Sequence, residues 1–133
     1  MSTLAARTLG ETANLALVRR VYAEVLGPLD SSQVDELFAP DYCQHSPLAN
    51  SGAQALKDFL DWARAASPLA EHRVKRLFAD GDHVIAHVHV IIEPGTAGNA
   101  VVDIFRIENG RIAEHWDVMQ PVPELTPDKL SMF

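Results

Sequence analysis

Apolar residues in the first part of the chain recur with the period of an α-helix. The clearest stripe predicts a first helix over residues 12–26. Its apolar members are Val18, Val21, Tyr22 and Val25. Gly27 and Pro28 follow directly, and both residue types favour the end of a helix.

Two further helices are expected before the middle of the chain. The second is short and stops at Pro40, and an extended stretch over residues 42–45 follows it. Ser51 and Gln54 have the spacing of a capping box, which predicts the start of a third helix. That helix is expected to close before Pro68.

The second half of the chain changes to the period and composition of β-strands. Four strands are expected over residues 72–79, 83–92, 100–107 and 111–120. Helices followed by a meander predict an α+β fold, with the helices on one face of a curved antiparallel sheet. A single domain over residues 1–133 is expected, with a proline-rich tail that wraps the outside and starts a last helical turn at Thr126.

The hairpin between the last two strands decides which side chains share a face. A three-residue loop over residues 108–110, followed by a bulge, places Asp103 opposite His115. A strict two-residue turn would instead place Asp103 opposite Trp116. With the longer loop, one face carries Val101, Asp103, Phe105, Ile107, Ala113, His115 and Asp117.

Composition narrows the possible partners and compartments. The net charge of −7 argues against nucleic acid or an anionic membrane as a partner. Cys43 is the only cysteine, so no disulfide requires an oxidising compartment, and this thiol is interpreted as packing. Met1 to Glu11 contains no long apolar run, so we expect a cytoplasmic protein without a signal peptide.

Ionisable residues on the expected buried face are the main candidates for chemistry. Asp103, His115 and Asp117 are costly to bury unless they pair or serve a ligand. His45 ends the short extended stretch and is expected to point into a pocket mouth. The ordinary alternatives are a satisfied aspartate–histidine pair for the strand residues and a simple loop histidine for His45.

Other side chains are expected to line the pocket without reacting. Phe59 and Trp62 of the third helix, with Phe105 of the third strand, are candidates for its wall. His89 is a further candidate, and it forms an H-x-H pair with His87 on one strand face. Because no carboxylate shares that face, half-buried histidines are favoured over a metal site, and no metal or cofactor is expected.

Several segments together resemble the SnoaL-like polyketide cyclases and their ketosteroid isomerase relatives in the nuclear transport factor 2-like superfamily. These segments are Leu37-Phe38-Ala39, residues 42–47 (YCQHSP), residues 100–107 (AVVDIFRI), Asn109-Gly110-Arg111-Ile112 and residues 114–118 (EHWDV). The resemblance extends from about Asn14 to Glu124. It implies a cone, in which a strongly curved sheet wraps three helices around an apolar pocket and often forms a dimer.

The resemblance also implies roles for individual residues. In ketosteroid isomerase, a tyrosine and a protonated aspartic acid form an oxyanion hole and a second aspartate is the base. Tyr22 and Asp103 match the first two positions, but Ser46 stands at the base position and cannot act as a base. Either His45 or Asp117 is then the candidate base, and Asp117 matches the general acid/base of the SnoaL-type cyclases.

Two functions therefore stay open. One is a cofactor-independent isomerase, cyclase or lyase that enolises a small, mostly apolar carbonyl compound, with His115 tuning or relaying protons. The other is a non-catalytic module for small-molecule binding or dimerisation. Ile104, Trp116 and Val118 are expected on the outer face as an apolar patch, which predicts a homodimer through the sheet.

Overall fold

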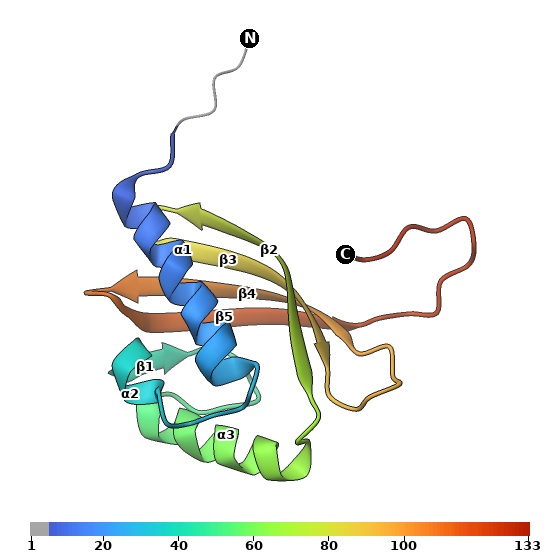
Figure 1. Ribbon diagram of the computed structural model, residues 1–133, viewed down its shortest axis with the longest axis horizontal. Coiled ribbons are helices and arrows are strands. Elements are labelled where there is room, and N and C mark those ends of the chain that lie inside the picture. Colours follow the sequence, from blue (N-terminus) through green and yellow to red (C-terminus); the bar gives the residue numbers. More distant parts are fainter. Residues whose placement is uncertain (1–5) are drawn as a thin grey trace.

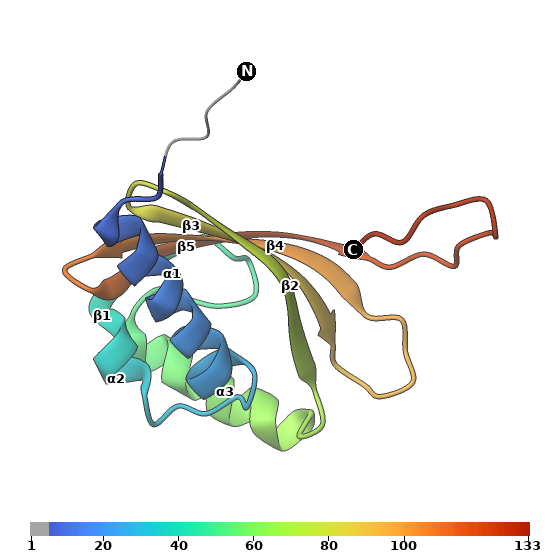
Figure 2. The ribbon, with the colours of Figure 1, turned by 45° about the horizontal axis from the view of Figure 1, so that its top comes forward.

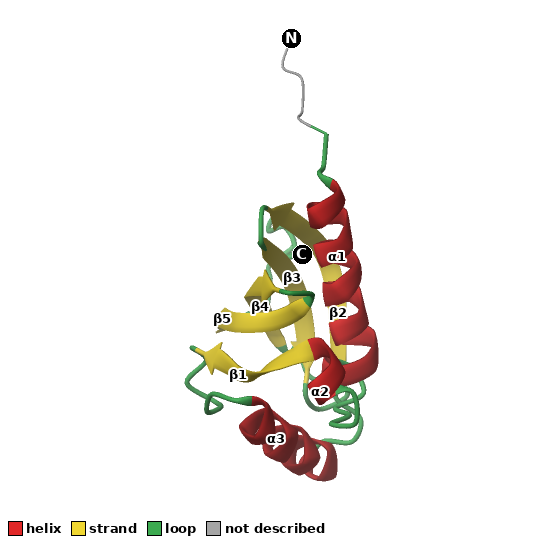
Figure 3. Ribbon diagram, turned by 90° about the vertical axis from the view of Figure 1, so that its left-hand side faces the viewer, coloured by secondary structure: helices red, strands yellow, loops and turns green. Residues whose placement is uncertain are grey.

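Three helices lie on one side of a curved sheet in this computed structural model, which describes residues 6–133 (Figure 1). The helices are α1 (Leu9–Val21), α2 (Val34–Leu37) and α3 (Ala53–Ala66). The strands are β1 (Phe38–Gln44), β2 (Glu71–Asp80), β3 (His83–Ile91), β4 (Asn99–Glu108) and β5 (Arg111–Pro121). Side views place α1, α2 and α3 on the same side of the sheet, so the α+β prediction is confirmed (Figures 2 and 3).

The sheet is mixed and open. Its strand order is β1-β5-β4-β3-β2, and only β1 runs parallel to its neighbour. The sequence had predicted that the second helix continues to Pro40. Phe38 instead pairs with Ile112 of β5 and begins β1. The parallel partner satisfies backbone groups that a longer helix would otherwise satisfy, and α2 therefore ends at Leu37.

Local hydrogen bonds correct two predicted helix starts. α1 begins at Leu9 because Thr8 and Glu11 form a reciprocal capping box. The capping box expected at Ser51 is wrong, because the Ser51 hydroxyl accepts a hydrogen bond from the backbone N–H of Gln44. α3 follows Gly52, which has a φ of 97° and no side chain with which to cap the helix.

The hairpin between β4 and β5 has a shorter loop than predicted but the expected faces. Asn109 and Gly110 both have positive φ, and Glu108 pairs with Arg111, which defines a two-residue turn. A bulge then inserts Ala113 between two paired positions and shifts the alternation of β5 by one residue. Asp103 consequently pairs with Asp117, while the seven inward residues remain on one face.

The C-terminal segment leaves β5 and returns to the outer side of the sheet. The ring of Phe133 stacks on His89 and His87, with ring centroids 4.3 and 5.5 Å apart. The predicted wrapping is thus confirmed, but Thr126 begins a hydrogen-bonded turn to Lys129 and no helix.

No helix of residues 6–133 is long and apolar enough to cross a membrane, and the expectation for Met1 to Glu11 lies partly outside the described residues.

The end of α1 has an unusual geometry that positions a site residue. Residues Tyr22–Leu26 form one π-helical turn, in which the N–H of Gly27 donates to the carbonyl oxygen of Tyr22 at 2.8 Å. A Cβ atom at position 27 would lie 2.6 Å from that oxygen. The close backbone approach therefore requires glycine at this position.

Gly27→Ala is expected to lower the free energy of unfolding by about 1–3 kcal/mol, since the added methyl group overpacks against backbone. Gly10→Ala is the matched control, because its Cβ would meet nothing closer than 3.8 Å. It is expected to be neutral or to stabilise α1 by up to about 1 kcal/mol. Urea unfolding of both variants measures the difference, and equal stabilities would contradict the need for glycine at position 27.

Candidate functional site

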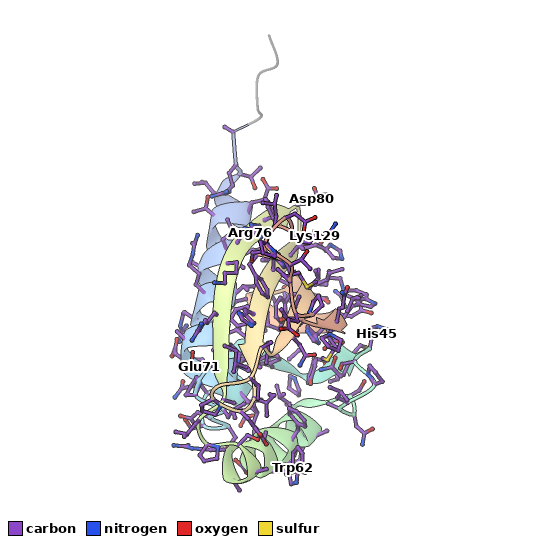
Figure 4. All side chains as sticks on the ribbon, turned by 90° about the vertical axis from the view of Figure 1, so that its right-hand side faces the viewer. His45, Trp62, Glu71, Arg76, Asp80 and Lys129 are labelled. Atoms are coloured by element: carbon purple, nitrogen blue, oxygen red, sulfur yellow. The ribbon has the colours of Figure 1, made fainter. Side chains whose placement is uncertain are left out.

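A cavity of about 500 Å³ opens between α3 and the inner face of the sheet. One part of its wall is apolar and includes Leu26, Leu56, Phe59, Leu60, Val101 and Met119. The other part is polar and includes Gln44, His72, Asn99, Asp103, His115 and Asp117. Trp62 also lines the cavity although 66% of its surface is exposed, and Figure 4 shows it beside α3 at the edge of the molecule. Phe59 and Trp62 thus lie where the sequence predicted.

Asp103 is the central group of the polar part. Its Oδ1 atom lies 2.9 Å from Nε2 of His115, and Oδ2 accepts a hydrogen bond from the hydroxyl of Tyr22. Asp103 and His115 are both buried. The pair is diagonal across β4 and β5, two residues away from the direct pairing that the sequence had predicted.

Gln44 determines which nitrogen of His115 carries a proton. The Oε1 atom of Gln44 accepts the backbone N–H of Ser46 at 3.0 Å and lies 2.7 Å from Nδ1 of His115. A carbonyl oxygen only accepts, so Nδ1 of His115 must donate. The hydrogen bond between Nε2 of His115 and the carboxyl group of Asp103 therefore contains a second proton, which these two groups share.

Asp117 faces the same cavity and lacks such partners. Asp117, Asp103 and His115 each present an atom within 4.8 Å of the others. Within residues 6–133, no hydrogen bond or ion pair to the Asp117 carboxylate is found, whereas Asp103 has two side-chain partners. Asp117 is therefore the carboxylate free to contact a ligand.

The same three side chains are also the one group in the described part of the chain arranged to hold a metal ion. Two carboxylates and an imidazole suit a divalent cation. A cation there would have to replace the hydrogen bond between Asp103 and His115, and this bond already satisfies both groups.

Tyr22 lies behind Asp103 and not on the cavity wall. Burial raises the pKa of Tyr22 well above its usual range, and the negative charges of Asp103 and Asp117 raise it further. The hydroxyl therefore stays protonated and is committed to Asp103. The resemblance had implied a direct contact of Tyr22 with the ligand, and the geometry instead gives it a positioning contact.

Phe105 also lies behind the polar groups, although the sequence placed it on the wall. Its ring packs edge-on against Tyr22, with centroids 5.9 Å apart, and lies 5.0 Å from the ring of His115. Phe105 is fully buried in the core, where both rings cover it. It therefore fixes the orientation of His115 from below the cavity floor.

Two histidines predicted at the pocket lie on the outer face. The ring of His45 stacks on Trp116, and its Nε2 atom lies 2.7 Å from Glu114, so the prediction that it points into the pocket is wrong. Figure 4 shows His45 at the edge of the molecule, away from α3. Alternation along this segment turns Gln44 inward and His45 outward. His89 likewise contacts Ala97 and Phe133 outside the cavity.

His72 is a cavity residue that the sequence reasoning missed. It lies near the start of β2, where exposed Glu71 and Arg73 flank it. Burial lowers the pKa of His72, while the nearby charge of Asp103 acts in the opposite direction. The alternation of this strand could have identified His72, because it turns the side chain to the inner face between two charged residues.

A family model for the SnoaL-like domain matches residues 18–115, and the chain belongs to this family. The match spans the end of α1 through His115 and includes the polar part of the cavity as far as that residue. No curated protein matches the chain by sequence.

Solved structures share the same fold. A candidate SnoaL-like polyketide cyclase from Jannaschia sp. CCS1 has 21% identity and a TM-score of 0.73, over 87% of this chain and 91% of its own. A candidate isomerase of the SnoaL-like family from Agrobacterium tumefaciens has 16% identity and a TM-score of 0.68, over 82% and 98%. A candidate polyketide cyclase from Acidithiobacillus ferrooxidans has 19% identity and a TM-score of 0.67, over 90% and 91%. At these identities the likeness concerns the fold alone.

The depressed pKa of His72 predicts a pH dependence of stability. Between the folded pKa and the ordinary value of 6.5, the unfolded chain binds a proton at this residue and the folded chain does not. The contribution to stability is therefore complete above pH 6.5 and is lost as the pH falls below it. His72→Leu should flatten this part of the profile, measured by urea unfolding at several pH values. An unchanged slope in the variant would show that His72 titrates normally.

Proposed function

We propose that the protein is a cofactor-independent acid/base catalyst that isomerises or cyclises a small, mostly apolar carbonyl compound. One observation carries this proposal: the free carboxylate of Asp117 faces an apolar cavity beside the proton-sharing pair of Asp103 and His115. A base and an acid held next to each other suit proton abstraction from carbon and its return elsewhere.

In the proposed reaction, Asp117 removes a proton from the carbon beside the substrate carbonyl group. The electrons of the broken C–H bond form the enolate, and the charge moves to its oxygen. In an isomerisation, protonated Asp117 returns the proton to another carbon. In a cyclisation, the enolate carbon attacks a second carbonyl group of the same molecule, and the Asp103–His115 pair protonates the new alkoxide. Asp117 then releases its proton to water and the pair regains one from water, which restores both groups.

Neighbouring side chains hold the acid in position. The hydroxyl of Tyr22 fixes one oxygen of Asp103, and Gln44 fixes the ring of His115 through Nδ1. Held in this way, the two groups do not have to reorient during the reaction, which lowers its cost. Tyr22 and Gln44 are thus positioning residues in this proposal.

The cavity wall supports an apolar substrate. α3 contributes Leu56, Phe59 and Leu60, which give the ligand a hydrophobic surface away from the polar groups. Among the described lining residues there is no lysine or arginine, so a charged carboxylate or phosphate finds no counterion there. We therefore expect a neutral compound with one polar end.

The alternative is a module that binds the same kind of compound without turnover. The cavity by itself is compatible with this function, since fold and pocket do not establish chemistry. The two functions differ in what removal of the Asp117 carboxylate does to a bound carbonyl compound.

Asp117→Asn is expected to slow exchange of the α-protons of β-tetralone for deuterium by about 10²–10⁴-fold, because the base is lost. Proton NMR in heavy water measures this rate. Asp80→Asn removes the same charge from an exposed site at the far end of the molecule from Trp62 (Figure 4) and should exchange like the wild type. If the wild type and Asp117→Asn give the same rate with every ketone of a neutral panel, the binding module is the better description.

We also propose that the protein forms a homodimer through the outer face of β4 and β5. Val118 is 69% exposed and shares this face with Ile104 and Trp116, whereas the C-terminal segment occupies the face of β3. An apolar strip of this kind is typical of an interface between copies.

Val118→Lys should weaken the dimer by more than about tenfold, because the interface would then bury a charge. Leu9→Lys, at the still more exposed start of α1, is the control and should leave the mass unchanged. Light scattering coupled to gel filtration measures both variants. A monomeric wild type at micromolar concentration would contradict the proposed interface.

A further inference from the structure

The polar part of the cavity contains one ionisable side chain that the proposed reaction does not yet use. We propose that His72 donates a hydrogen bond from Nε2 to the enolate oxygen of the substrate. This inference rests on the proposed function and assigns the residue that stabilises its intermediate.

The curvature of the sheet brings His72 to the reactive groups. β2 is the edge strand farthest from β5, yet in Figure 1 its first half crosses toward α3. His72 pairs with Val90, and both residues line the cavity that Asp103 and Asp117 face. The ring of Tyr22, which binds Asp103, lies 6.4 Å from the ring of His72.

The surroundings of the ring indicate which nitrogen carries the proton. Nδ1 of His72 is enclosed and has no hydrogen-bond partner among the described residues. A buried N–H without an acceptor is rarer in proteins than an under-used acceptor, so the proton is better placed on Nε2. Nε2 is not enclosed in this way, and His72 is one of the residues that line the cavity.

The donors around Asp103 are largely committed to other contacts. The hydroxyl of Tyr22 is committed to Asp103, and the side-chain amide of Gln44 donates to the hydroxyl of Tyr42. His115 donates to Gln44 and shares its other proton with Asp103. His72 is the imidazole of this cavity that has no competing partner within residues 6–133.

The expected protonation state of His72 suits this task. Burial lowers its pKa, so the ring is neutral at neutral pH and offers one N–H to the ligand. A neutral donor gains strength as negative charge develops on the oxygen, and it does not protonate Asp117 in the resting state. The donor therefore acts mainly in the intermediate and less in the bound substrate.

The first test is the tautomer of His72 in the free protein. Long-range ¹⁵N–¹H correlation spectra at neutral pH distinguish an Nε2–H ring from an Nδ1–H ring, with assignment by comparison with His72→Leu. The proposal expects the Nε2–H form. An Nδ1–H form or a doubly protonated ring would overturn it.

The second test compares a variant that loses the donor with one that keeps it. His72→Leu should lower kcat for α-proton exchange of β-tetralone by about 10²–10³-fold, with a smaller change in KM. His72→Gln places an amide N–H near the position of Nε2 and should recover activity to within about tenfold of the wild type. His87→Leu makes the same change on the outer face of β3 and is the control. Equal losses in His72→Leu and His72→Gln would assign His72 a role in packing only.

A binding measurement separates failure of this inference from failure of the proposed function. β-Naphthol carries an oxygen like that of an enolate, and its fluorescence reports binding without turnover. His72→Leu should bind it about tenfold more weakly than the wild type, and His72→Gln should not. If no ketone is exchanged by the wild type, the proposed function fails, and equal naphthol affinities in all three proteins would also remove His72 as a donor.

Discussion

The buried carboxyl group of Asp103 is the constraint on which the site depends. A carboxylate enclosed in a small core is unfavourable unless hydrogen bonds or charges compensate for the lost water. Tyr22 and His115 supply that compensation from α1's π-helical extension and from β5. This requirement brings one helix end and two strands together at Asp103. At that helix end, Gly27 permits the close approach to the carbonyl oxygen of Tyr22 because it has no Cβ atom.

A second layer of contacts extends from the same group. His115 is fixed by Gln44 of β1, which is itself held by the backbone of Ser46 and by Tyr42. Phe105 covers Tyr22 and His115 from the core side. The resulting chain is rigid and largely satisfied, and Asp117 stands apart from it as the free carboxylate. A satisfied acid beside a free base is the arrangement on which the proposed chemistry rests.

The two faces of the sheet separate the site from the rest of the surface. The inner face combines apolar residues with the polar groups around Asp103. The outer face carries the Arg106–Glu114 ion pair, the stacked rings of His45 and Trp116, and the returning Phe133. Membership of the SnoaL-like family is consistent with this division, and the polar residues on the inner face decide what the pocket can do.

The sequence by itself determined the element types, the order of helices before strands, and the inward face of the last hairpin. Period, turn residues and alternation are local properties, so they can be read without the tertiary structure. Tyr22, Asp103 and His115 were identified from them and from the family resemblance. The error in loop length did not change the faces, because the bulge at Ala113 restores the same alternation.

Only the tertiary structure decided which polar side chains meet. The curvature of the sheet brings His72 of an edge strand to the cavity, and nothing in the local pattern encodes how close His72 lies to Asp103. Contacts with Glu114 and Trp116 hold His45 on the outer face, whereas its place in the sequence had predicted that it points into the pocket mouth. Tyr22 lies behind Asp103 and does not contact the ligand site, as the resemblance had implied that it would. Packing, and not sequence spacing, decides which residues far apart in the chain form hydrogen bonds.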